Sequence, residues 1–64
     1  MTRRALEKHL RSQGCEFDHH GKKHDFWTNP SNGAMAPVPR HRQLKRGTVR
    51  SICHALQIAA PPGI

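Results

Sequence analysis

Turn-forming residues interrupt the middle of this chain so often that helices can form only toward its two ends, which limits the possible folds. Residues 2–13 and 48–58 carry apolar side chains at the spacing of an amphipathic helix. Thr2 and Gly14 are suited to begin and end the first helix, and we expect Thr48 or a neighbouring residue to cap the second. The core-facing positions are Ala5, Leu6 and Leu10 in the first helix and Val49, Ile52, Cys53 and Leu56 in the second.

The segment between the two predicted helices has room only for short strands. The predicted strands are residues 15–19, 23–28 and 34–38. The alternation in the first strand predicts that Phe17 and His19 lie on the same side. The run Asn-Pro-Ser-Asn-Gly at 29–33 is a strong turn signal. Pro37 and Pro39 cannot donate backbone hydrogen bonds, so we expect the third strand at an edge of its sheet.

Two helices can cover one face of three antiparallel strands and leave the other face open. The predicted fold class is therefore α+β, a two-layer α-β-β-β-α sandwich that forms a single domain over residues 1–58. A chain of 64 residues has no room for a second domain, and its core must be thin. Residues 59–64 include two consecutive prolines, and we expect them to form a flexible tail.

The positive charge of the chain is concentrated in its second half. The formal net charge is +7, and all four acidic residues precede residue 26. Beyond that point, five cations follow with no carboxylate between them: Arg40, Arg42, Lys45, Arg46 and Arg50. Such a segment concentrates polyanions around the protein, which makes nucleic acid the leading class of partner. The alternative is a domain whose cationic loop is simply solvated.

The cysteines and histidines do not form a recognisable metal or nucleophile motif. Cys15 and Cys53 both lie in apolar patterns and are interpreted as core residues. The group Cys15, His19, His20 and His24 lacks the second pair of ligands that a zinc knuckle needs, so we predict neither a metal site nor a cofactor. The two thiols, with no signal peptide and no long apolar run, favour a cytoplasmic location away from membranes.

His24 is the strongest candidate for chemistry on a nucleic acid. Lys22 and Lys23 precede it, so a phosphate group near its ring would be stabilised. RNA supplies its own nucleophile, the 2′-hydroxyl, and a histidine can accept or donate that proton near neutral pH. On the residues alone, an ordinary surface histidine in a solvated turn remains the alternative. Trp27 could stack on a base, although a core position is the preferred interpretation.

The order of several short motifs resembles the HicA family of toxins from bacterial toxin–antitoxin systems, over nearly the whole chain. The motifs are His24, Phe26-Trp27, Asn29-Pro30, Val38-Pro39-Arg40-His41 and Leu44-Lys45-Arg46-Gly47-Thr48. The sequence departs from the family pattern at two places. The glycine that precedes the histidine lies one position early, at Gly21, and Gln57 stands where the family commonly ends its last helix with glycine.

The resemblance implies a fold similar to a double-stranded RNA-binding domain and the activity of an mRNA interferase, a metal-independent endoribonuclease that inhibits translation. It assigns the catalytic role to His24, and it implies mRNA and a HicB-type antitoxin as partners. The residues predicted to bind the RNA backbone are Lys22, Lys23, Arg40, Arg42, Lys45 and Arg46. The alternative function is a non-catalytic RNA-binding module of the double-stranded RNA-binding type.

Overall fold

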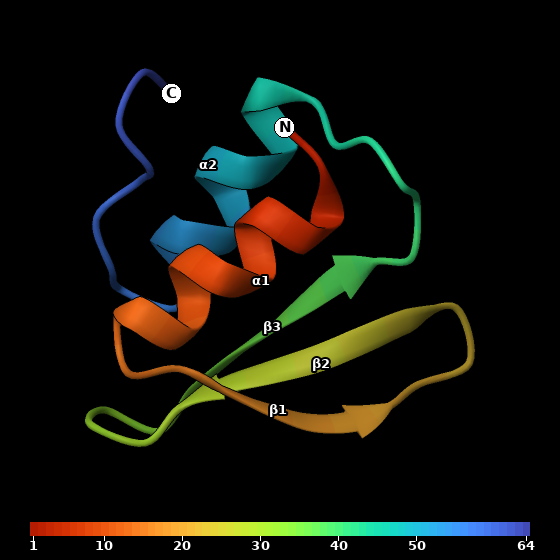
Figure 1. Cartoon of the computed structure of the whole chain (residues 1–64). Helices are drawn as coiled ribbons and strands as arrows, with labels where there is room; N and C mark the ends of the chain where they lie inside the picture. Colours follow the sequence, from red (N-terminus) through yellow and green to blue (C-terminus); the bar gives the residue numbers. More distant parts are fainter.

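Two helices lie on the same face of a three-stranded antiparallel sheet, as Figure 1 shows. The computed structural model describes residues 1–64. The elements are α1 (Arg3–Ser12), β1 (Glu16–His20), β2 (His24–Asn29), β3 (Ala34–Pro39) and α2 (Arg46–Ala55). This order confirms the predicted α-β-β-β-α sandwich. The opposite face of the sheet carries no helix (Figure 1).

The central strand, β2, directs alternate side chains toward the helices. The strand order is β1-β2-β3, and Asp25, Trp27 and Asn29 are all buried. Trp27 is only 1% exposed, so it is a core residue and is not available to stack on a base. The other core residues are Leu6, Leu10, Cys15, Ala36, Val38, Leu44, Val49, Ile52, Cys53 and Leu56. Both cysteines are therefore core residues, as predicted, and neither forms a disulfide.

Strand β3 lies at one edge of the sheet, which confirms the position predicted from its prolines. Pro37 pairs with Phe26, and Pro39 pairs with His24. A proline nitrogen cannot donate to a neighbouring strand, so these two residues fit only where their nitrogen atoms face the free side. Strand β1 forms the other edge, and all of its residues are exposed.

A bulge in β1 changes the side on which one predicted residue lies. The register shifts between Phe17 and His19, so Phe17 pairs with Trp27 whereas His19 pairs with Phe26. The His19 and Phe26 rings stack with their centroids 4.8 Å apart. The prediction that Phe17 and His19 share a side is wrong, because an extra residue in the strand reverses the alternation. His20 lies beside Phe17 instead, with the ring centroids 4.8 Å apart.

Local hydrogen bonds close both ends of α1. The Oγ1 atom of Thr2 accepts a hydrogen bond from the N–H group of Ala5 at 3.1 Å, which confirms the predicted cap. After the helix, Gly14 has a φ of +85° in the left-handed region. The N–H groups of Gly14 and Cys15 donate to carbonyl groups of the last turn. This pattern is a Schellman motif, which turns the chain from α1 into the sheet.

The second helix begins earlier than predicted. Its first residue is Arg46 and its N-cap residue is Lys45, which gives no side-chain hydrogen bond, so the helix is capped by a residue near Thr48 and not by Thr48 itself. Leu44 and Val49 are both buried in the core. They occupy the two positions that flank a helix start in a hydrophobic staple. Burial of this pair starts the helix ahead of Thr48.

The second helix ends at Ala55, earlier than predicted, and the turn after β2 closes this end. Gln57 follows the helix with a φ of +58°, in the left-handed region. The side-chain amides of Asn29 and Asn32 donate to the carbonyl oxygen of Leu56, at 2.9 and 3.3 Å. The turn between β2 and β3 thus satisfies a carbonyl group that the helix leaves without an intrahelical partner.

Residues 59–64, predicted to be a flexible tail, lie back beside the helices (Figure 1). The Nε2 atom of His9 donates to the carbonyl oxygen of Ala59 at 2.8 Å. The guanidinium of Arg46 donates to the carbonyl oxygen of Gly63 at 3.0 Å. These contacts place the segment against α1 and α2, and its flexibility stays a prediction.

Candidate functional site

His24 lines a groove between β3 and α2. The groove has a volume of about 610 Å³, and His24 is half-buried there. Its other lining residues are Ala36, Pro37 and Pro39 of β3 and Gly47, Thr48, Ser51, Ile52 and Ala55 of α2. No carboxylate lines the groove. His24 is therefore the one side chain of the groove suited to transfer a proton.

The first turn of α2 brings free backbone donors to this groove. Gly47 and Thr48 line it, and the N–H groups of residues 46–48 have no acceptor within the protein. The first turn contains no acidic residue, and Lys45 gives no side-chain cap. Free N–H groups at the start of a helix attract anions. The groove thus combines a titratable ring with the positive end of a helix, an arrangement suited to a phosphate group.

The turn before His24 is so tight that it requires glycine at position 21. The N–H group of Gly21 donates to the carbonyl oxygen of His24 at 2.8 Å. A Cβ atom at Gly21 would lie 2.5 Å from a ring carbon of Phe26 and 2.7 Å from the same carbonyl oxygen. Any larger residue would displace His24 or Phe26. The early position of this glycine, which departs from the family pattern, is what the observed turn needs.

Arg40 fastens the same turn to the chain that follows β3. Its Nε donates to Oδ1 of Asp25 at 2.9 Å. Its terminal nitrogens donate to carbonyl oxygens of the turn, those of Gly21, Lys22 and His24. The guanidinium of Arg40, which was predicted to contact RNA, is therefore engaged within the protein. Its position makes Arg40 a support for the turn that carries His24.

Asp25 anchors this arrangement from the buried side of β2. It is 8% exposed and accepts hydrogen bonds from Nδ1 of His20 at 2.8 Å and from Arg40. These two bonds, that of His20 first, hold the pKa of Asp25 below its ordinary value, although burial acts in the opposite direction. Sequence reasoning missed Asp25. The available signal was its alternation with Trp27 and Asn29, which places an acid on the buried face of the strand.

The other cations predicted to bind RNA lie on two segments of the chain. Lys22 and Lys23 are exposed on the turn between β1 and β2. Arg42 and Lys45 are exposed on the connection between β3 and α2. Arg46 is also exposed, but its guanidinium donates to a carbonyl group near the C-terminus. The hydrogen bonds of Arg40 hold the turn and the connection together.

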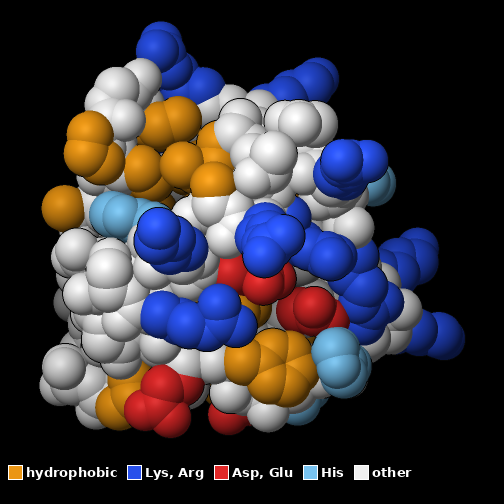
Figure 2. Space-filling model, in the orientation of Figure 1, with side chains coloured by type: hydrophobic (Ala, Val, Ile, Leu, Met, Phe, Trp, Pro, Cys, Tyr) orange, Lys and Arg blue, Asp and Glu red, His pale blue; other side chains and the backbone are white.

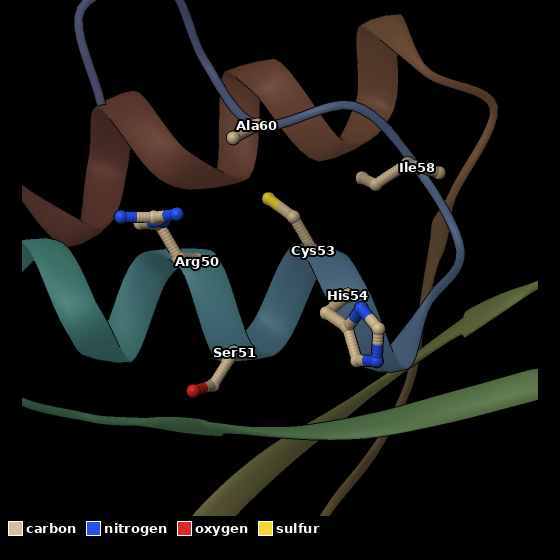
Figure 3. A pocket seen from close by; sticks show the side chains of 6 residues that line it. All are labelled: Arg50, Ser51, Cys53, His54, Ile58 and Ala60. Atoms are coloured by element: carbon tan, nitrogen blue, oxygen red, sulfur yellow. The ribbon is translucent and has the colours of Figure 1, made fainter.

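A second cavity, of about 460 Å³, contains none of the predicted site residues. Figure 3 shows the side chains that line it, from Arg50, Ser51, Cys53, His54, Ile58 and Ala60. Ser51 points away from Cys53, on the side of α2 that carries the His24 groove. Burial raises the pKa of the Cys53 thiol, and the nearby Cys15 adds to this effect, so Cys53 is a poor nucleophile. In the whole molecule, no three His, Cys, Asp or Glu side chains form a cluster that could hold a metal ion.

The fold and the groove define a class of protein: a small cationic α-β-β-β-α domain with a histidine beside the start of a helix. The family described as the HicA toxin of bacterial toxin-antitoxin matches residues 3–58 of the 64-residue chain, and the chain belongs to this family. No match was found among curated proteins or among solved structures. Membership confirms the resemblance carried by the motifs and implies an antitoxin as partner. None of the helices combines the length and the apolar character needed to cross a membrane.

Proposed function

We propose that this protein is an endoribonuclease that cleaves mRNA in the cytoplasm and thereby inhibits translation, as the toxin of its toxin–antitoxin pair. The observation that carries the proposal is the position of His24 in a groove that Gly47 and Thr48 of α2 also line, two residues whose N–H groups have no acceptor within the protein. Membership of the HicA toxin family supports the toxin role. The net charge of +7 supports a polyanionic substrate.

In this proposal the RNA provides the nucleophile and His24 transfers the proton. The imidazole accepts the proton of a 2′-hydroxyl group while the 2′-oxygen attacks the adjacent phosphorus atom. The bond between phosphorus and the 5′-oxygen then breaks, and the leaving oxygen takes the proton from the imidazolium. The products are a 2′,3′-cyclic phosphate and a free 5′-hydroxyl group. The His24 imidazole accepts one proton and gives one proton back, so it is neutral again at the end of the reaction.

Fixed positive groups stabilise the charge that develops on the phosphate during this reaction. Lys22 and Lys23 lie on the turn before His24, and the groove is lined by Gly47 and Thr48, whose N–H groups have no acceptor within the protein. Donors that already point at the developing charge lower the barrier without reorganisation. None of these roles requires a metal ion.

Replacement of His24 tests this proposal directly. We expect purified His24→Ala protein to cleave mRNA at least about 100-fold more slowly than wild type, which is the usual size of a general acid–base contribution. His54→Ala is the matched control, because His54 is an exposed histidine in the other cavity. The control should cleave RNA at the wild-type rate. Undiminished cleavage by a folded His24→Ala protein would refute the role of His24.

The alternative is an RNA-binding module without catalysis, which the fold class also permits. In that case wild type and His24→Ala would bind the same RNA with equal affinity, and neither would shorten it. Gel analysis of the RNA after incubation separates the two functions, since only an endoribonuclease yields new 5′-hydroxyl ends.

We further propose that the antitoxin is of the HicB type and that it covers the groove. The connections between the helices and strands are short, so we expect the groove and the predicted RNA-binding cations to be covered by a partner. Carboxylates on the partner would complement these cations and speed its capture of the toxin. Purified partner should form a stable complex and block RNA cleavage. A neighbouring gene product that binds without reducing cleavage would contradict this arrangement.

A further inference from the structure

The start of α1 forms one wall of a concave surface that the His24 site does not include. We call this surface the arginine basin, and it has a volume of about 610 Å³. Its lining residues are Thr2, Arg3, Arg4, Glu7, Arg40 and Arg42. None of them is apolar, and the single carboxylate, that of Glu7, lies 3.6 Å from Nε of Arg3. Figure 2 shows Lys and Arg side chains gathered over α1 and toward the side where the chain leaves β3.

Hydrogen bonds from the backbone and from the Arg3 side chain join the two distant segments that build the arginine basin. The N–H group of Arg3 donates to the carbonyl oxygen of Arg42, and the Arg3 guanidinium donates to that of Arg40, both at 2.9 Å. The neighbouring residues are paired as well: Thr2 with Gln43, and Met1 with Leu44. The start of α1 is thus fixed to the connection between β3 and α2. Arg4 and Arg42 extend from this frame as exposed residues.

We propose that the arginine basin binds phosphate groups of the RNA substrate beyond the cleavage site, an inference that rests on the proposed function. Pro39 lines the His24 groove, and the next residue, Arg40, lines the basin, so one strand of RNA can pass from one to the other. The guanidinium groups of Arg3 and Arg40 are engaged within the protein. Arg4 and Arg42 therefore supply the phosphate contacts, for which the planar guanidinium is well suited.

The composition of the basin favours a nucleic acid over an acidic segment of a protein. Protein interfaces usually have an apolar centre surrounded by a polar rim. The basin offers no apolar residue for such a centre. A phosphate backbone, in contrast, is bound mainly by cationic side chains and polar donors. The arginines would add affinity for any sequence and would leave the choice of cleavage site to the groove.

The test measures binding of the full chain to a single-stranded 2′-O-methyl RNA, which has no 2′-hydroxyl group and cannot be cleaved by the proposed route. Kd is determined over a range of salt concentrations for wild type, Arg4→Ala, Arg42→Ala and Arg50→Ala. Arg50→Ala is the matched control, because it removes the same charge from an exposed residue of the other cavity. Circular dichroism confirms that each variant is folded.

We expect Arg4→Ala and Arg42→Ala each to reduce the salt slope by about 0.7, which weakens Kd by roughly fivefold at 0.1 M salt. Arg50→Ala should keep the wild-type slope. Salt slopes equal to that of wild type for all three variants would overturn the inference. If wild type still bound the RNA tightly in that case, the proposed function would stand. If the Arg4→Ala and Arg42→Ala proteins bound RNA normally but no longer bound the antitoxin, the basin would be a surface for protein binding. That result would also overturn the inference. Wild type that fails to bind RNA would instead refute the proposed function, and the inference with it.

Discussion

Asp25 holds together three parts of the chain that meet beside His24. Its carboxylate accepts hydrogen bonds from His20 at the end of β1 and from Arg40 after β3. The pKa of Asp25 is lowered by these bonds, whereas the unfolded chain titrates near the ordinary value of about 3.9. The stability that this group contributes is therefore present above about pH 4 and is lost as the pH falls through the lower folded value.

Asp25→Asn should lower the free energy of unfolding at pH 7 by about 1–3 kcal/mol, because it removes the charged acceptor of two hydrogen bonds. The deficit should be smaller at pH 2 than at pH 7, because protonation of Asp25 increasingly removes the same charge from wild type as the pH falls. Urea denaturation at both pH values measures the effect. Asp18→Asn is the control, since Asp18 is exposed and pairs only with its neighbour His19, and its change should stay within about 0.5 kcal/mol. Similar effects of the two substitutions would contradict the role of Asp25.

At the scale of residues, the candidate side chains could be named from the sequence, but their contacts could not. His24 and the cations around it could be named from their types and order. The hydrogen bonds of the Arg40 guanidinium could not be predicted, because the carbonyl groups that it binds lie 16 to 19 residues away in the chain. They become its neighbours only after β2 has paired with both flanking strands. The need for glycine at position 21 likewise depends on the place of the Phe26 ring.

At the scale of elements, the two helices end in the same way but with different residues. Gly14 follows α1 and Gln57 follows α2, and both have left-handed backbones, with φ of +85° and +58°. The N–H groups of Gln57 and Ile58 donate to the carbonyl oxygens of His54 and Cys53, which completes a second Schellman motif. Glycine adopts this conformation without steric cost, whereas a residue with a Cβ atom is strained in it.

Gln57→Gly should therefore raise the free energy of unfolding by about 0.5–1 kcal/mol. Gln57→Ala keeps the Cβ atom and serves as the control, with little or no gain expected. Thermal and urea denaturation of the two variants beside wild type give the comparison. A gain of the same size from alanine would show that the glutamine side chain, and not the backbone strain, is the source of the effect.

The order of the elements was predictable because turn signals and apolar periods agree along most of the chain. The exceptions are positions where tertiary packing prevails over local preference. Burial of Leu44 with Val49 starts α2 before Thr48, which a local cap signal would have chosen. The bulge between Phe17 and His19 reverses the alternation of β1, and no residue type in the strand marks it.

At the scale of the whole molecule, cleavage of RNA should persist in excess EDTA. The proposed chemistry uses an imidazole, cationic side chains and backbone N–H groups, and it assigns no step to a metal ion. Rates with EDTA, and with EDTA followed by excess Mg²⁺, should agree within about twofold, whereas a metal-dependent nuclease assayed in parallel should lose its activity. Loss of cleavage in EDTA with recovery by one particular divalent cation would contradict the mechanism.

The cationic character of the molecule was predictable from the sequence, but its distribution over the surface was not. Arg3 and Arg40 are 37 residues apart in the chain, and their contact exists only because the start of α1 pairs with the connection before α2. The amphipathic pattern indicated that the basic face of α1 points outward, without showing which other segment lies beside it. The arginine basin is therefore a property of the tertiary structure.

The prolines of β3 also decide how this sheet can meet another chain. A foreign strand lengthens a sheet by exchanging N–H and carbonyl groups with a free edge, which is the route to amyloid-like fibres. Pro37 and Pro39 remove donors from the β3 edge at alternate positions, so a strand that approached there would find carbonyl oxygens with few N–H groups to match them. We therefore expect copies of this chain not to polymerise through β3, and a partner that adds a strand to the sheet to do so along β1.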